Sequence, residues 1–171
     1  MAITPETHDY RTFEVRALDT GEEDKQYRVE GYAAVFDEET VLYEYDGIEY
    51  KEVIDRSAFT GAEMRDVVMN YNHGGKPVAR TKNGTLQLTV DTRGLRISAD
   101  LSGTEEGRRL YEEIRGGYLD QMSFAFTVNK QEYDRAKHLR RITGFKRVFD
   151  VAAVDIPAYD GTSIAARSWA K

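Results

Sequence analysis

The sequence predicts a single, mainly β domain with some α structure, folded as a closed or partly closed barrel with one or two helices on its surface. Two observations carry this prediction: most apolar stretches alternate with polar residues, and turn-forming residues separate these stretches at short intervals. The 171 residues suffice for one hydrophobic core, and 40% of them are hydrophobic. We expect a flexible arm over residues 1–10, the domain over residues 11–160 and a flexible tail over residues 161–171.

The N-terminal half contains two clear strand patterns. Residues 11–18, RTFEVRAL, alternate apolar and polar, and so does YRVEGYAAVF from Tyr27, where Gly31 indicates a bulge. Residues 55–64, DRSAFTGAEM, lack this alternation and predict a short helix, with Asp55 or Ser57 as its N-cap. The segment VVMNY, which precedes His73, is a further candidate strand.

The clearest hairpin joins TLQLTV to LRISADL across a turn that contains Gly94. Directly after it, residues 102–117 predict the best helix in the sequence. The helix would start at Ser102 or Thr104, use Glu105 in a capping box and end at a Gly-Gly pair. Its narrow apolar stripe places it on the outside of the domain.

The C-terminal part of the domain predicts further strands. QMSFAFTV indicates a strand, the polar segment NKQEYDRAK a turn, and HLRRITGFKRVFDVAAVDI one or two more strands.

Composition excludes several classes of function. The net charge is −6, with 24 basic residues dispersed along the chain, which disfavours nucleic-acid binding. No apolar run is long enough for a bilayer, and the N-terminus lacks the pattern of a signal peptide, so we expect a soluble, non-secreted protein. The absence of cysteine removes disulfides, thiolate zinc sites and cysteine nucleophiles. The histidines lack metal-binding spacing, so we expect no cofactor or metal.

Three residues could supply hydrolytic chemistry, although each also has an ordinary interpretation. His73 precedes a Gly-Gly turn and could simply cap that turn. Ser123 lies on a strand opposite Phe124 and Phe126, where a serine usually satisfies a backbone group or faces solvent. Asp150 precedes an apolar run and could form a salt bridge with a nearby base.

Together these residues provide a hydroxyl, an imidazole to take its proton and an acid to orient the imidazole. Their order along the chain, His, Ser, Asp, differs from the orders in chymotrypsin, subtilisin and the α/β-hydrolases. The sequence also lacks the G-x-S-x-G elbow of the last group.

Several segments jointly resemble the tailed-phage prohead protease family, the phage counterpart of the herpesvirus assembly proteases. The resemblance covers about Tyr27 to Pro157. It runs through VEGYAAVFDEE, YKEVIDRSAFTGA, YNHGGKPVART, TLQLTVDTRGLRISADL and LYEEIRGGYLDQMSFAFTV. The specific features are the NH followed by ART, the D-x-x-GL hairpin and the Ser-Phe-x-Phe strand after a Gly-ended helix.

The resemblance implies a herpesvirus-protease-like β-barrel ringed by a few helices, with Ser123 as nucleophile and His73 as general base. The third member corresponds to Asp150, where the family more often has Glu. His138 is the runner-up, because the herpesvirus relatives use a second histidine, and Asp155 is a more distant choice. Arg140 and Arg141 resemble the Arg-Arg pair near the herpesvirus oxyanion hole, although the spacing differs.

The implied function is that of a serine endopeptidase of capsid maturation, acting in the host cytoplasm inside the assembling prohead. Its substrates would be the scaffolding segment of the major capsid protein, or a separate scaffold protein, and the protease itself, with the tail DGTSIAARSWAK as the region of self-cleavage. Self-association is left open, and neither nucleic acid nor a membrane is an expected partner. The alternative from another class is a non-catalytic scaffold or capsid-interaction module with the same barrel.

Overall fold

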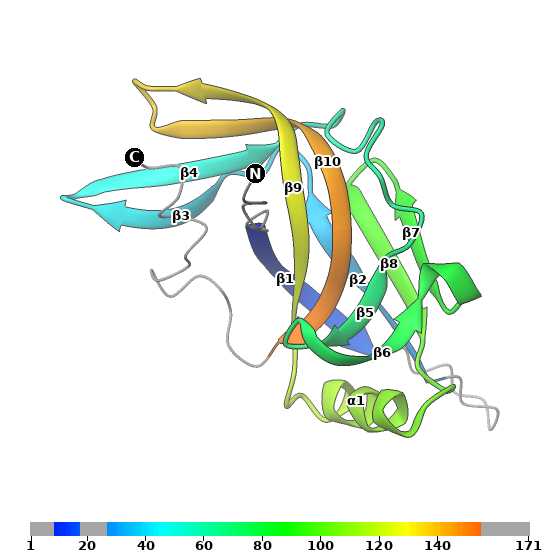
Figure 1. Cartoon of the computed structure of the whole chain (residues 1–171). Helices are drawn as coiled ribbons and strands as arrows, with labels where there is room; N and C mark the ends of the chain where they lie inside the picture. The colour runs from blue at the N-terminus through cyan, green and yellow to red at the C-terminus, as the bar shows by residue number, and fades with distance from the viewer. Residues whose placement is uncertain (1–8, 18–26, 155–171) are drawn as a thin grey trace, which may run out of the picture.

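A computed structural model describes residues 9–17 and 27–154 of the chain. This part is built from ten strands, one α-helix and one turn of 3₁₀ helix (Figure 1). In chain order these are β1 (Asp9–Ala17), β2 (Arg28–Val35), β3 (Thr40–Tyr45), β4 (Ile48–Ile54), β5 (Val68–Tyr71), β6 (Gly74–Arg80), η1 (Thr81–Asn83), β7 (Leu86–Val90), β8 (Gly94–Asp100), α1 (Glu105–Arg115), β9 (Gln121–Asp134) and β10 (Leu139–Val154).

The strands form one open, ten-stranded sheet. Its order is β3-β4-β10-β9-β1-β2-β8-β7, and β5 pairs with both β10 and β6. The mainly β prediction is therefore confirmed, but the closed barrel is wrong, because the end strands β3 and β7 do not pair with each other. The expected ring of helices is also wrong for the described residues, which contain a single α-helix.

Strand β10 divides one of its edges between two partners. Residues 139–142 pair in parallel with β4, and residues 150–153 pair in parallel with β5. The other edge of β10 pairs with β9 along its whole length. The sheet therefore branches at β10, and the β3–β4 hairpin projects to one side in Figure 1 instead of completing a cylinder.

The core lies on one face of the β9–β10 hairpin. Phe124 and Phe126 stack with ring centroids 4.6 Å apart, and Phe145 of β10 meets Phe126 edge-on at 4.9 Å. Phe59 packs on Phe145 at 4.6 Å. These aromatic contacts join both strands of the hairpin to the segment after β4, so residues distant in sequence share one core.

A cluster of buried charged side chains lies where the first residues of β10 pair with β4. Glu52 of β4 accepts two hydrogen bonds of 2.6 Å from Arg11 of β1, through Nε and Nη2, and one of 3.1 Å from Arg140 Nη1. All three side chains are buried. Charges removed from water are tolerated only when they are paired, so this cluster ties β1, β4 and β10 together.

The best predicted helix and hairpin are both confirmed, but the capping box with Glu105 is wrong, because Gly107 stands three residues after the N-cap and Glu105 pairs with Arg109. Helix α1 begins after Thr104, whose side chain accepts a 2.8 Å hydrogen bond from the Gly107 amide, and it lies outside the sheet in Figure 1. The hairpin forms as β7 and β8. The bulge in β2 falls between Tyr32 and Ala34 rather than at Gly31.

Two other predictions are wrong. Residues 55–64 form successive turns rather than a helix. Asp55 Oδ2 accepts from the Ser57 amide, as an N-cap would, but the backbone bonds that follow join residues three apart, from the Ala58, Thr60 and Ala62 amides. The polar segment after Val128 continues β9 to Asp134 instead of turning. The side chains of this segment are exposed and polar, so the sequence shows no alternation of apolar residues that would predict a strand. Pairing with β10 nevertheless provides hydrogen bonds for its backbone groups.

Replacing Glu52 with Ala should lower the free energy of unfolding by about 3–5 kcal/mol, because it leaves two buried guanidinium groups without their carboxylate. Denaturant unfolding measures this. The matched control is Glu49→Ala on the same strand, which removes only a surface contact of 3.9 Å to Lys51 and should cost less than about 1 kcal/mol. Equal costs for the two variants would contradict the role given to the cluster.

Candidate active site

His73 lies in a tight turn that few residues other than glycine adopt. Asn72 and His73 have φ values of 50° and 57° and connect β5 to β6, with Tyr71 paired to Gly74 across the turn. Two-residue turns of this kind need positive φ at both positions and favour Asn followed by Gly. A histidine at the second position costs conformational energy, and such costs are typical of functional sites.

The ring of His73 is held by Asp150. His73 Nδ1 lies 2.5 Å from Asp150 Oδ1, and the two side chains are 17% and 16% exposed. Since a carboxylate only accepts hydrogen bonds, Nδ1 carries the proton in this pair, and Nε2 of the neutral ring is the basic nitrogen. Nε2 is itself buried.

A β-bulge directs Asp150 to the correct face of the sheet. Val148 pairs with Phe126, but Asp150 pairs with Ala125, so two residues of β10 correspond to one of β9 at this point. Val148 belongs to the core, as do Val151 and Ala153 after the bulge. The extra residue, Phe149, therefore reverses the alternation and turns Asp150 away from the core.

Ser123 lies on that same face. It pairs with Ala152 of β10, two residues beyond Asp150, so Ser123 and Asp150 are diagonal neighbours with Cα atoms about 7–8 Å apart. The Ser123 side chain is 1% exposed, and its Oγ makes no hydrogen bond within the described part of the chain. The structure thus places the predicted serine and the His73–Asp150 pair on one patch of sheet.

Asn70 is a residue of this patch that the sequence analysis missed. It pairs with Ala152 from the opposite side to Ser123, so one row runs Ser123, Ala152, Asn70 across three strands. Asn70 is 6% exposed, and its Oδ1 has no hydrogen-bond partner among the described residues. The available signal was a polar amide inside the apolar strand VVMNY.

Comparison with known protein families decides the class of the protein. The family model described as Caudovirus prohead serine protease matches residues 11–171. The chain belongs to this family. No curated protein and no solved structure matched the chain.

The prohead protease is therefore a serine peptidase of capsid maturation, which acts in the assembling capsid on capsid protein. Among its described residues, no helix is long and apolar enough to cross a membrane. The same residues contain no group of three or more His, Cys, Asp or Glu side chains arranged to hold a metal ion.

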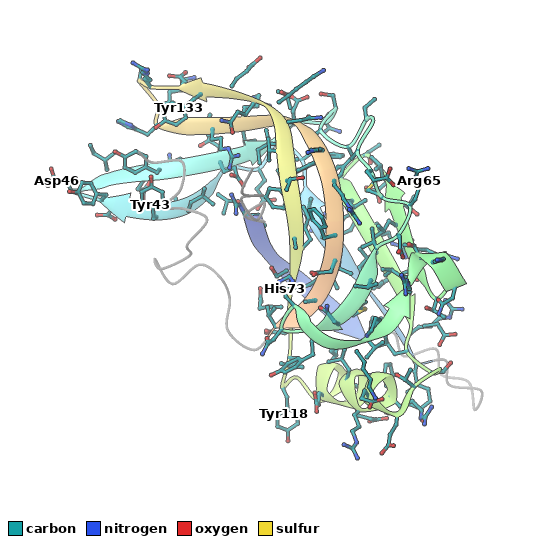
Figure 2. The ribbon with its side chains drawn as sticks, viewed as in Figure 1. Tyr43, Asp46, Arg65, His73, Tyr118 and Tyr133 are labelled. Carbon is teal, nitrogen blue, oxygen red and sulfur yellow. The ribbon has the colours of Figure 1, made fainter. Side chains whose placement is uncertain are left out.

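The structure does not bring the remaining candidate residues to Ser123. Arg140 is paired with Glu52, and Arg141 with Asp55 at 3.0 Å, in the half of β10 that pairs with β4. His138 lies in the turn between β9 and β10, with its ring 5.1 Å from that of Tyr50. Figure 2 shows this end of the hairpin, marked by Tyr133, far from His73. Asp155 and the tail lie outside the described residues.

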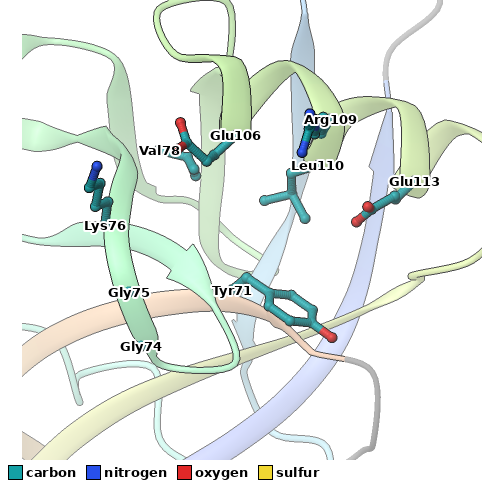
Figure 3. Close-up of a pocket in the computed structure, with 9 residues that line it drawn as sticks. All are labelled: Tyr71, Gly74, Gly75, Lys76, Val78, Glu106, Arg109, Leu110 and Glu113. Atoms are coloured by element: carbon teal, nitrogen blue, oxygen red, sulfur yellow. The ribbon is translucent and has the colours of Figure 1, made fainter.

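A pocket of about 530 Å³ opens between β6 and α1 of the prohead protease (Figure 3). Its lining includes Tyr71 and Gly74, which flank the His73 turn, and Leu110 of α1. Tyr71 follows Asn70 directly on β5, so the two side chains leave opposite faces of that strand. The pocket therefore lies across β5 from the Ser123 patch.

The turn conformation of His73 can be tested without an activity assay. Both His73→Ala and His73→Gly lose the ring contact to Asp150, but only Ala keeps a Cβ at φ 57°. We expect the Gly variant to be more stable than the Ala variant by about 1 kcal/mol in denaturant unfolding. The matched control is the same pair of changes at His138, which has φ 50° and should show the same sign. Equal stability of the two His73 variants would show that the turn does not hold this conformation.

Proposed function

We propose that this prohead protease cleaves the scaffolding segment of the major capsid protein, or a separate scaffold protein, and also itself, with Ser123 as nucleophile, His73 as general base and Asp150 as the orienting acid. The observation that supports this assignment best is the 2.5 Å contact of His73 Nδ1 with Asp150 on the face of the sheet that carries Ser123. A serine is activated when a base that is held by an acid takes its hydroxyl proton. His73 Nε2 and Ser123 Oγ are not hydrogen-bonded to each other in this conformation, so the proposal requires them to approach when substrate binds.

In the proposed reaction, Ser123 Oγ attacks the scissile carbonyl carbon while His73 Nε2 takes the hydroxyl proton. The imidazolium that forms is stabilised by the Asp150 carboxylate. Collapse of the tetrahedral intermediate breaks the C–N bond, and His73 gives its proton to the departing amine. A water molecule, activated by the same nitrogen, then hydrolyses the acyl-enzyme and restores Ser123.

Geometry favours Asp150 over His138 as the third member. Asp150 contacts His73 directly. His138 lies just before the first residue of β10, fourteen positions before Ala152, which is the residue of β10 that pairs with Ser123. The direct pairing of β5 with β10 also brings the two backbones close together, which suits Asp in place of the longer Glu that the family more often has.

The burial of Ser123 adds a condition to this mechanism. A side chain that is 1% exposed cannot contact a peptide bond in the conformation described here. Substrate binding therefore requires a rearrangement that exposes Ser123 Oγ. Sites covered in this way gain water exclusion once the substrate has entered.

Replacing Ser123 with Ala should abolish capsid processing and leave folding intact. The variant removes a buried hydroxyl that makes no hydrogen bond within the described structure, so its free energy of unfolding should be unchanged or higher. Each form is co-expressed with the major capsid protein of the same phage, and intact mass spectrometry identifies the products. Truncated capsid protein is expected with the wild type only. Full-length capsid protein with both forms, in correctly assembled proheads, would favour the non-catalytic assembly module instead.

Changing the acid should separate the two candidates for the third member. Asp150→Asn keeps the size of the side chain but removes the charge that stabilises the imidazolium, so we expect a loss of about 10⁴-fold in kcat. His138→Ala should leave kcat close to that of the wild type, because His138 lies at the other end of the hairpin. The processing rates of the two variants under matched conditions measure this. The opposite ranking would move the third role to His138.

A further inference from the structure

The row Ser123, Ala152, Asn70 contains two buried polar groups without partners. Ser123 Oγ and Asn70 Oδ1 are both inaccessible to solvent, and neither makes a hydrogen bond within the described part of the chain. Burying an amide without a partner destabilises a fold, so native structures rarely keep one without a compensating role. The proposed mechanism accounts for Ser123, but it gives Asn70 no function.

The row places a small side chain between Ser123 and Asn70. Ser123 and Asn70 lie on strands to either side of β10, so their Cα atoms are about 10 Å apart, twice the usual strand spacing. Ala152, between them, has only a methyl group to occupy this space. It is fully buried but is not part of the main core cluster, which agrees with a position on the Ser123 face.

The side chains point to this common face for a simple reason. Residues directly opposite each other in neighbouring strands project to the same side of a sheet. Met69 and Tyr71, the neighbours of Asn70 on β5, leave the other face, where Met69 joins the core and Tyr71 lines the pocket between β6 and α1 (Figure 3). Asn70 is thus the amide of β5 that faces the proposed nucleophile.

We propose that Asn70 is a catalytic residue whose side-chain N–H donates to the carbonyl oxygen of the scissile bond as that oxygen becomes negative. This inference rests on the proposed function, because it takes Ser123 as the attacking group. When the Oγ–C bond forms, the π pair of the carbonyl moves onto oxygen, and the hydroxyl proton passes to His73 Nε2. The Asn70 donor stabilises that oxyanion until the C–N bond breaks and the carbonyl re-forms.

A side-chain amide suits this role in a site of this kind. Rotation about its last bond exchanges the oxygen and the nitrogen, so either atom can face the substrate. A neutral donor also adds no charge that would compete with Asp150 for His73. Arg140 and Arg141, the donors that the sequence analysis offered, are engaged by carboxylates elsewhere on β10, whereas Asn70 shares a row with Ser123 across Ala152.

Asn70→Ala and Asn70→Asp test this inference with a peptide that spans the capsid cleavage site identified by mass spectrometry. Both variants lack the N–H donor, so kcat should fall by about 10²–10³-fold with KM little changed. The melting temperature of Asn70→Ala should be equal to or above that of the wild type, since a buried amide oxygen without a hydrogen-bond partner has been removed. A structural role would instead lower the melting temperature and would leave kcat of the folded fraction intact.

Thr127→Val is the matched control. Thr127 Oγ1 is another buried group of β9 without a hydrogen bond in the described structure, but it pairs with Arg147, beyond the bulge at Phe149. Its replacement should leave kcat unchanged. Wild-type kcat in Asn70→Ala or Asn70→Asp, with Ser123→Ala inactive, would overturn the role of Asn70 and leave the proposed function standing. Full activity in Ser123→Ala would overturn the proposed function itself.

Discussion

Strand β10 constrains the rest of this structure, because one of its edges forms backbone hydrogen bonds with two different strands. Its first residues hydrogen-bond to β4 and its last residues to β5, while its other edge pairs with β9 throughout. Every strand that contributes to the proposed site is therefore positioned through β10. The same division makes the sheet branch at β10, with β4 on one arm and β5 on the other.

The two halves of β10 handle buried polar groups in different ways. In the half beside β4, Glu52 accepts hydrogen bonds from both Arg11 and Arg140, so each of these buried charges has a direct partner. In the half beside β5, Ser123 and Asn70 are buried without such partners. The first arrangement stabilises the fold, and the second leaves hydrogen-bonding capacity unused, as a site for a substrate requires.

Local strain and local irregularity meet at the same place. The left-handed conformation of His73 and the bulge at Phe149 both lie within a few residues of the His73–Asp150 contact. Each departs from regular strand geometry, and each is needed to bring an imidazole and a carboxylate together over β10. Regular alternation would have turned Asp150 into the core, where a carboxylate could not face His73.

The sequence by itself determined the elements whose physics is local. Helix α1, the β7–β8 hairpin and the aromatic face of β9 followed from caps, turn residues and alternation, and the family resemblance pointed to Ser123, His73 and Asp150. Only the tertiary structure decided how strands share edges, because pairing between β10 and β5 links residues 82 positions apart and leaves no periodic signal. The bulge at Phe149 and the row that joins Asn70 to Ser123 are decided in the same way. Both depend on the register between neighbouring strands, and the sequence of one strand does not determine that register.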